Sequence, residues 1–116
     1  MPNNNIVTAL DFLVKDYRCS LSYEFDRGNK YLYDNGVFKV IIFQWQELGD
    51  LDIHLIYNMQ DYRIDPSLEE PKALFEMKSK TRGIKWFFYD YEKDFWRVVS
   101  MIIKRKLKQF GITEQR

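Results

Sequence analysis

The sequence predicts an α+β fold, in which a four-stranded antiparallel meander is packed on one face by an N-terminal helix and a long C-terminal helix. Apolar residues recur at three- and four-residue steps near both ends of the chain, as in amphipathic helices. Between these ends, apolar and polar residues alternate with the period of two of a half-buried strand. An Asn-Gly dipeptide joins two of the alternating stretches and strongly signals a tight hairpin.

The N-terminal helix is predicted for the segment NNNIVTALDFLVKDY. Asn4 or Asn5 can cap its first turn, because an Asn side chain accepts a hydrogen bond from a free backbone N–H. Apolar side chains follow along one side of this helix, and we expect them in the core: Ile6, Leu10, Leu13 and Tyr17.

Four strands are predicted after this helix. The first lies within CSLSYEFD and is followed by a turn at DRGNK. The second covers residues 31–34 and runs into Asn35 and Gly36, which tolerate the positive φ angles of a type I′ turn. The third is VFKVIIFQWQ, and a loop at residues 47–50 leads to the fourth, LDIHLIYNMQ.

The expected loop lengths also predict which residues face each other across the sheet. A two-residue loop at Asn35 and Gly36 pairs Tyr33 with Phe38, and a loop at 47–50 pairs Ile42 with Leu55. One face then collects the apolar residues Leu21, Tyr23, Phe25, Tyr31, Tyr33, Phe38, Val40, Ile42, Ile53, Leu55 and Tyr57. The other face carries Ser20, Ser22, Glu24, Leu32, Lys39, Ile41, Phe43, Trp45, Asp52, His54, Ile56 and Asn58.

The remaining segments complete a single domain over residues 1–116. The proline-containing stretch DYRIDPSLEEPK reads as an extended loop, and KALFEMKSKTRG can hold a short helix. Residues 86–89 read as a short strand or a buried lead-in. Asp90 is the expected N-cap of the C-terminal helix, and Gly111 is its expected stop.

Residue counts limit the chemistry. With one Cys and one His, the chain can form neither an internal disulfide nor a Cys/His zinc site, so no metal is expected. The scattered glycines form no phosphate-binding or dinucleotide motif, so no cofactor and no catalytic residue are expected. No apolar run is long enough to span a bilayer and no signal peptide precedes the first helix, so a cytoplasmic location is expected.

Charge is unevenly distributed, although the formal net charge is only +1. Residues 1–71 contain 6 Lys/Arg and 12 Asp/Glu, whereas residues 72–116 contain 12 and 5. A basic cluster near the chain end could bind the phosphates of a nucleic acid: Lys104, Arg105, Lys106 and Lys108. Its position also suits the C-terminus of a helix dipole and the acidic half of the chain, and we prefer this internal interpretation.

The second sheet face is the preferred candidate site. Both helices are needed to cover the first face, which leaves large apolar groups on the second face without an obvious lid, unless residues 61–71 or 86–89 fold back over it. We expect these residues to contact a partner protein or a second copy of the chain: Ile41, Phe43, Trp45, Asp52, His54 and Ile56. A small enzyme centred on His54, with Asp52 nearby, is an alternative, but the spacing places no nucleophile beside this His.

A small protein-binding module without catalytic activity is therefore the preferred function, and a nucleic-acid-binding module is the runner-up. In size and layout alone, the chain resembles the bacterial immunity proteins of toxin–immunity pairs. This resemblance implies an inhibitor that binds and neutralises another protein.

Overall fold

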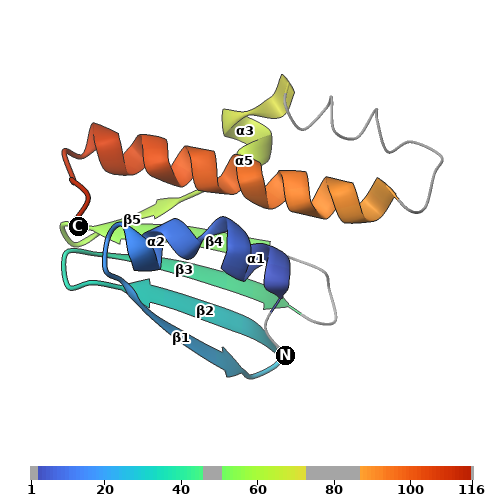
Figure 1. Cartoon of the computed structure of the whole chain (residues 1–116), viewed down its shortest axis with the longest axis horizontal. Coiled ribbons are helices and arrows are strands. Elements are labelled where there is room, and N and C mark those ends of the chain that lie inside the picture. Colours follow the sequence, from blue (N-terminus) through green and yellow to red (C-terminus); the bar gives the residue numbers. More distant parts are fainter. Residues whose placement is uncertain (1–2, 46–50, 73–86, 116) are drawn as a thin grey trace.

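The computed structural model describes residues 3–45, 51–72 and 87–115, with only the backbone of residues 45, 67 and 87–93 (Figure 1). Five strands form one antiparallel sheet in sequence order: β1 (Ser20–Phe25), β2 (Gly28–Asp34), β3 (Phe38–Trp45), β4 (Leu51–Tyr57) and β5 (Gln60–Arg63). The described helices are α1 (Asn4–Ala9), α2 (Asp11–Lys15), α3 (Pro66–Glu69) and α5 (Phe87–Gln109). The α+β class is confirmed, but the expected number of strands is too low.

Strand β5 lies where the sequence predicted an extended loop. Asn58 and Met59 form a two-residue turn with φ angles of 53° and 65°, which are the positive values of a type I′ hairpin. Tyr57 then pairs with Gln60, and Leu55 pairs with Tyr62. The prolines that suggested a loop follow this strand instead of interrupting it, because Pro66 begins α3.

The N-terminal helix is broken into α1 and α2 at Leu10. This residue has φ −103° and ψ 10°, outside the usual helical values. The cap is Asn3, whose side chain accepts a hydrogen bond from Asn5 N–H at 2.8 Å, so the expected cap at Asn4 or Asn5 is wrong by at least one position. Ile6, Leu10 and Leu13 are all fully buried, as predicted.

The hairpin between β2 and β3 closes one residue later than expected. Asn35 N–H donates to the carbonyl of Phe38, so the two loop residues are Gly36 and Val37. Gly36 has φ 85° and Val37 does not have a positive φ, which fits a type II′ turn better than type I′. Tyr33 consequently pairs with Val40, and the predicted pairing of Tyr33 with Phe38 is wrong.

The side chain of Asn35 explains this shift. Its Oδ1 accepts hydrogen bonds from Val37 N–H at 2.9 Å and Phe38 N–H at 3.1 Å. Its Nδ2 donates to the carbonyl of Tyr17 at 2.9 Å. Asn35 therefore holds the turn with its side chain, an Asx-type arrangement, instead of supplying a left-handed backbone.

The pairing of β3 with β4 is displaced in the same way. Val40 lies opposite Leu55 and Ile42 opposite Ile53, so the predicted pairing of Ile42 with Leu55 is also wrong. The loop expected at 47–50 lies outside the described residues. Both displacements amount to two positions, and side chains alternate with a period of two, so every residue keeps its predicted face.

The sheet has one face buried in the core and one face that the described helices leave uncovered. The core face carries the buried residues Tyr31, Tyr33, Phe38, Val40, Ile42, Ile53 and Leu55. We call the opposite side the open face; around its centre it carries Glu24, Lys30, Leu32, Lys39, Ile41, Phe43, Asp52, His54, Ile56, Asp61 and Arg63.

Strand β1 departs from the predicted burial. Leu21 and Phe25 occupy the expected side, opposite Tyr33 and Asn29, but they are 37% and 56% exposed. Strand β1 is an edge strand, and α1 and α2 bury their side chains against the central strands. The strand β2 also begins at Gly28, within the segment expected to be a turn.

Helix α5 begins at Phe87, not at an Asp90 cap, so residues 87–89 are helical instead of forming a strand or lead-in. Residue 86 and the short helix expected in KALFEMKSKTRG lie outside the described residues, apart from Lys72. Its end is as predicted. Gly111 has φ 75°, its N–H bonds to the carbonyl of Lys108, and Ile112 N–H bonds to that of Leu107. This pair of bonds is a Schellman motif, which requires a left-handed residue and so favours Gly.

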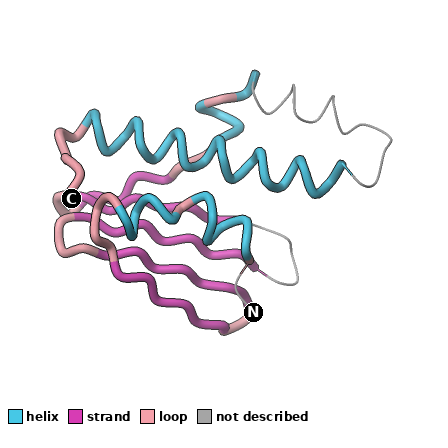
Figure 2. The backbone as a smooth tube through the Cα atoms, in the orientation of Figure 1, coloured by secondary structure: helices cyan, strands magenta, loops and turns pink. Residues whose placement is uncertain are grey.

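A single core lies between the sheet and the helices. Figure 2 shows α5 running beside the α1–α2 pair. The core joins Ile6 of α1 and Leu13 of α2 to the core face, and α5 contributes Trp96, Val98, Val99, Ile102, Ile103 and Leu107. Within the described ranges, no helix has both the length and the apolarity needed to cross a membrane.

Candidate functional site

The centre of the open face is a strip of apolar side chains. Leu32 lies opposite Ile41 on neighbouring strands, and Phe43 lies one pleat further along the same strand as Ile41. On β4, Ile56 completes the strip. All four side chains are half-buried, and none belongs to the core cluster. This contrast follows from the described helices α1, α2 and α5, whose buried side chains join the core on the other side of the sheet.

The structure brings together five of the six residues predicted to bind a partner. Ile41 lies directly opposite His54, and Phe43 lies directly opposite Asp52. Ile56 is two residues from His54 on β4 and faces the same side. The sixth residue, Trp45, pairs through its backbone with Gly28, and its side chain lies outside the described part of the chain.

Ion pairs surround the apolar strip. Lys30 Nζ lies 3.6 Å from Glu24 Oε1, and Arg63 Nη2 lies 3.3 Å from Asp52 Oδ1. These charged side chains are between 35% and 68% exposed, so water screens both pairs and their net stabilisation is small. The open face therefore has the layout of many protein interfaces, an apolar centre within a polar rim.

The only histidine is bound to a different acid from the one that the sequence suggested. His54 Nδ1 lies 2.9 Å from Asp61 Oδ1 on β5, whereas Asp52 pairs with Arg63. The residues that flank His54 on the neighbouring strands are Ile41 and Arg63, and neither is a nucleophile. Ser22 shares this row of the sheet but lies three strands away, roughly 14 Å at the usual strand spacing.

A hollow of about 300 Å³ lies at one end of the open face, beside the turn between β1 and β2. Phe43 lines it together with Glu24, Asp26, Arg27 and Lys30. The turn can approach β3 because Gly28 has no side chain: a Cβ there would lie 2.5 Å from the carbonyl oxygen of Gln44. The sequence did not predict this hollow, because Gly28 was assigned to a turn and not to the start of a strand.

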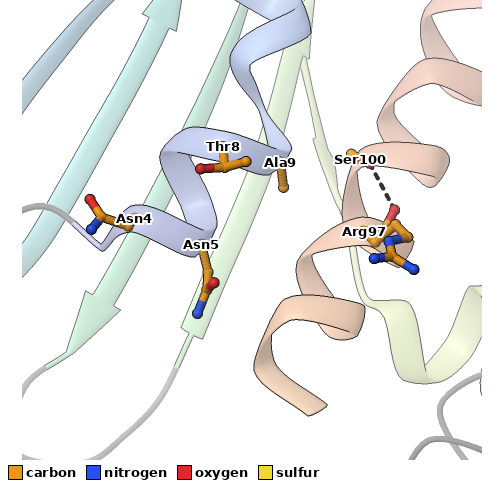
Figure 3. Close-up of a pocket in the computed structure, with 6 residues that line it drawn as sticks. All are labelled: Asn4, Asn5, Thr8, Ala9, Arg97 and Ser100. Carbon is orange, nitrogen blue, oxygen red and sulfur yellow. Dashed lines mark hydrogen bonds between the residues drawn. The ribbon is translucent and has the colours of Figure 1, made fainter. Parts of the chain in front are cut away.

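A cavity of about 460 Å³ lies between α1 and α5 (Figure 3). It is lined by Asn4, Asn5, Thr8, Ala9, Arg97 and Ser100. Its α5 groups are engaged locally, since Ser100 Oγ donates to the carbonyl of Arg97 and the Arg97 side chain pairs with Asp94. Its described lining residues form no convergent set of acids, bases or nucleophiles. In the described ranges, no three His, Cys, Asp or Glu side chains gather in a way that could hold a metal ion.

Three residues of the predicted basic cluster contact other parts of the chain. Lys104 Nζ lies 4.7 Å from the centre of the Phe12 ring. Lys106 Nζ lies 2.9 Å from Glu69 Oε1, and Arg105 pairs with Glu70. Lys108 is exposed. Glu69, the last residue of α3, and Glu70 thus lie against the basic side chains of α5. Part of the positive charge of the C-terminal segment is therefore neutralised within the fold.

Comparison with known proteins provides no relative. No protein-family model matches the chain, no curated protein matches it, and no solved structure matches it. Inference about function therefore rests on the side chains and their arrangement. Of the surfaces described above, the open face combines a contiguous apolar strip with a polar rim.

Proposed function

We propose that the protein is a small non-catalytic binding module that holds another protein against its open face, in the manner of an inhibitor or immunity protein. One observation carries this proposal: Ile41, Phe43 and Ile56 form an apolar strip on a sheet face to which no described helix contributes cover. Contiguous exposed apolar surface is uncommon on proteins that act alone and marks interaction sites.

The dimensions of the face suit a protein partner. Five strands at the usual spacing make a surface roughly 19 Å wide, and strands of seven to eight residues make it about 25 Å long. Standard interfaces use about 800 Å² from each partner, and the flat outline of this face, roughly 475 Å², is more than half of that area before the relief of its side chains is counted. The aromatic ring of Phe43, next to its hollow, is the natural anchor, because a few buried rings supply most of the energy in such interfaces.

The charges of the open face favour a protein over a nucleic acid. Phosphate binding requires an excess of Lys and Arg along the contact surface. Here Glu24, Asp52 and Asp61 are interleaved with Lys30, Lys39 and Arg63, so the face has no basic excess. Arg105 and Lys106 also form ion pairs within the chain, with Glu70 and Glu69, which reduces the positive charge available on α5.

The proposal can be tested by site-specific photocrosslinking. A photoreactive phenylalanine analogue at position 43 should capture a particular cellular protein, whereas the same analogue at position 68 should not. Leu68 is the matched control because it is 79% exposed and belongs to α3, away from the open face. The captured protein is then purified and its affinity for the full chain measured.

Phe43→Ala should weaken this purified complex by at least tenfold, equivalent to about 1.4 kcal/mol, while Leu68→Ala leaves it unchanged. A complex that survives both Phe43→Ala and Ile41→Asp would show that the open face is not the binding surface. Catalytic conversion of a substrate that requires His54 would instead favour the enzyme alternative.

A further inference from the structure

Strand β1 presents an unpaired edge. In the described part of the chain it has a neighbour on one side only, β2, and all six of its residues pair in regular register without a bulge. At every second residue of an edge strand, the backbone N–H and C=O groups point away from the sheet and are available to another strand. Such an edge is a template for strand addition.

The hydrogen-bond pattern identifies which residues of β1 have these outward groups. Asp26 N–H donates to the carbonyl of Gly28, directly opposite, at 3.0 Å. Bonding alternates along an antiparallel pair, so the backbone groups of Ser20, Ser22 and Glu24 point toward β2. Those of Leu21, Tyr23 and Phe25 point away from the sheet.

Among the described residues, none of the usual protective features lies on this edge. Proteins block an edge strand with Pro, Lys, a bulge or a covering element, but β1 has the sequence SLSYEF and Glu24 is its only charge. The other edge differs: β5 has four residues, includes Asp61 and Arg63, and its Tyr62 ring packs 4.8 Å from that of Phe110 on the chain segment after α5. Two exposed apolar side chains lie within β1 itself, Leu21 at 37% and Phe25 at 56%.

We propose that β1 pairs antiparallel with β1 of a second copy of the chain, around a two-fold axis at Tyr23. Tyr23 then lies opposite the partner's Tyr23, and Leu21 lies opposite the partner's Phe25. On the other face, Ser22 lies opposite the partner's Glu24. The exposed apolar side chains become cross-strand pairs, which stabilise antiparallel sheets, and no two like charges are opposed.

Alternative registers fit less well. A slip of one residue would place Leu21 opposite Glu24 and would mix the core and open faces. A slip of two residues would leave Phe25 opposite Cys19, which is outside the strand and buried. Only the register centred on Tyr23 keeps residues 21–25 of both copies fully paired.

This dimer joins two five-stranded sheets into one continuous sheet and places both open faces on the same side. It goes beyond the proposed function, because it uses β1 and not the open-face residues of β3 and β4. Pairing of five residues buries less than a standard interface, so we expect a reversible association that depends on concentration.

The first test is the mass of the full chain in solution as a function of concentration, by sedimentation equilibrium. The parent should shift from 14.2 kDa toward twice that mass. Leu21→Lys should remain monomeric, because it introduces an edge charge opposite the partner's Phe25. Leu68→Lys, the same change at an exposed site on α3, should dimerise like the parent. Circular dichroism and thermal melting check that both variants are folded.

A mixing experiment tests the register. Leu21→Glu and Phe25→Lys should each be monomeric alone, because each places a charge opposite an apolar residue. When mixed, they can form a heterodimer with one Glu–Lys pair and one Leu–Phe pair, so the mixture should recover the dimeric mass. Failure of the mixture to dimerise would overturn the proposed register.

Other outcomes would overturn the edge-strand dimer itself. A parent chain that stays at 14.2 kDa up to its highest soluble concentration would do so. So would a dimer that persists in Leu21→Lys but is lost in Phe43→Ala, because that result would assign self-association to the open face. Loss of the dimer in Leu21→Lys with undiminished binding of the crosslinked partner protein would support the edge and leave the proposed function standing.

Discussion

Phe38 and Phe43 lie on the same strand, β3, but point to opposite sides of the sheet. Phe38 is 2% exposed and packs edge-on against Tyr17, with the ring centres 5.7 Å apart. Phe43 is half-buried on the open face between Lys30 and Asp52. The effects of removing a core ring and a surface ring can therefore be compared on the same strand.

Truncation of these two rings should have different effects on stability. Phe38→Ala should lower the free energy of unfolding by about 3–5 kcal/mol, because it removes a ring from a packed core. Phe43→Ala should lower it by only about 1 kcal/mol, since a half-buried ring removes less apolar surface from water than the fully buried ring of Phe38. Urea denaturation measures both values. Equal losses would mean that Phe43 belongs to a second core and that the open face is covered.

The turn at Asn35 depends on three side-chain hydrogen bonds. Asn35→Ala removes the acceptor for Val37 and Phe38 N–H and the donor to the carbonyl of Tyr17. Because a hydrogen bond contributes about 1 kcal/mol, we expect a loss of roughly 2–3 kcal/mol of stability by urea denaturation. Asn35→Asp retains the acceptor and should lose less. A stable Asn35→Ala variant would show that the turn forms without this side chain.

The hydroxyl of Tyr33 is buried in the core and has no hydrogen-bond partner in the described part of the chain. Burial raises the pKa of this phenol well above its usual value. Tyr33→Phe should therefore keep or increase stability, by up to about 1 kcal/mol, because it removes an unsatisfied polar group. Tyr31→Phe is the matched control: Tyr31 is equally buried, but its hydroxyl accepts a hydrogen bond from Asn3 N–H. Tyr31→Phe should lower the free energy of unfolding by about 1 kcal/mol, and urea denaturation measures both variants.

Ion pairs connect the basic residues of α5 to the end of α3. Lys106→Gln and Arg105→Gln should each lower stability by about 0.5–1 kcal/mol, because they break the contacts with Glu69 and Glu70. Combining Lys106→Gln with Glu69→Gln should cost less than the sum of the two single changes. The exposed Lys108→Gln serves as the control. Tight binding of DNA or RNA by the parent, falling steeply with salt, would contradict this internal role.

The thiol of Cys19 is buried, which raises its pKa from 9.0 to about 11, and the nearby Asp34 adds to this shift. The folded state therefore keeps the thiol protonated where the unfolded chain would ionise it. The stabilisation that comes from the higher pKa of the folded state is complete below pH 9 and is lost as the pH rises from 9 toward 11. Between pH 9 and pH 11, the parent should lose about 2 kcal/mol more than Cys19→Ala, because each unit of pKa difference is worth 1.36 kcal/mol and the titration is incomplete at both limits. Urea denaturation at several pH values measures the difference; parallel pH profiles would mean that the thiol is not shielded in the native state.

Local rules in the sequence predicted much of the fold. Alternation assigned Phe38 to the core face and Phe43 to the open face, since side chains on a strand change sides at every residue. Gly111 predicted the end of α5, because a Schellman motif needs a left-handed residue. The same alternation placed Ile41, Phe43, Asp52 and His54 on one face. The predicted pairing of Phe43 with His54 is wrong by two positions, because Phe43 lies opposite Asp52 and His54 lies opposite Ile41.

Tertiary structure decided what local rules leave open. Alternation is unchanged by a shift of two residues, so it could not distinguish Tyr33 opposite Phe38 from Tyr33 opposite Val40. That choice depended on the side chain of Asn35, which donates to the carbonyl of Tyr17, a residue distant in sequence. The acid that pairs with His54 likewise became known only when β5 brought Asp61 beside it.

The sequence by itself determined which residues are apolar on each face and where α5 must end, because these properties follow from the spacing of side chains along a single segment. Only the tertiary structure decided strand register, the exposure of Leu21 and Phe25, and the ion pairs between α3 and α5. These features depend on which segments lie next to each other, on how far the helices extend over the sheet, and on contacts between residues far apart in the chain.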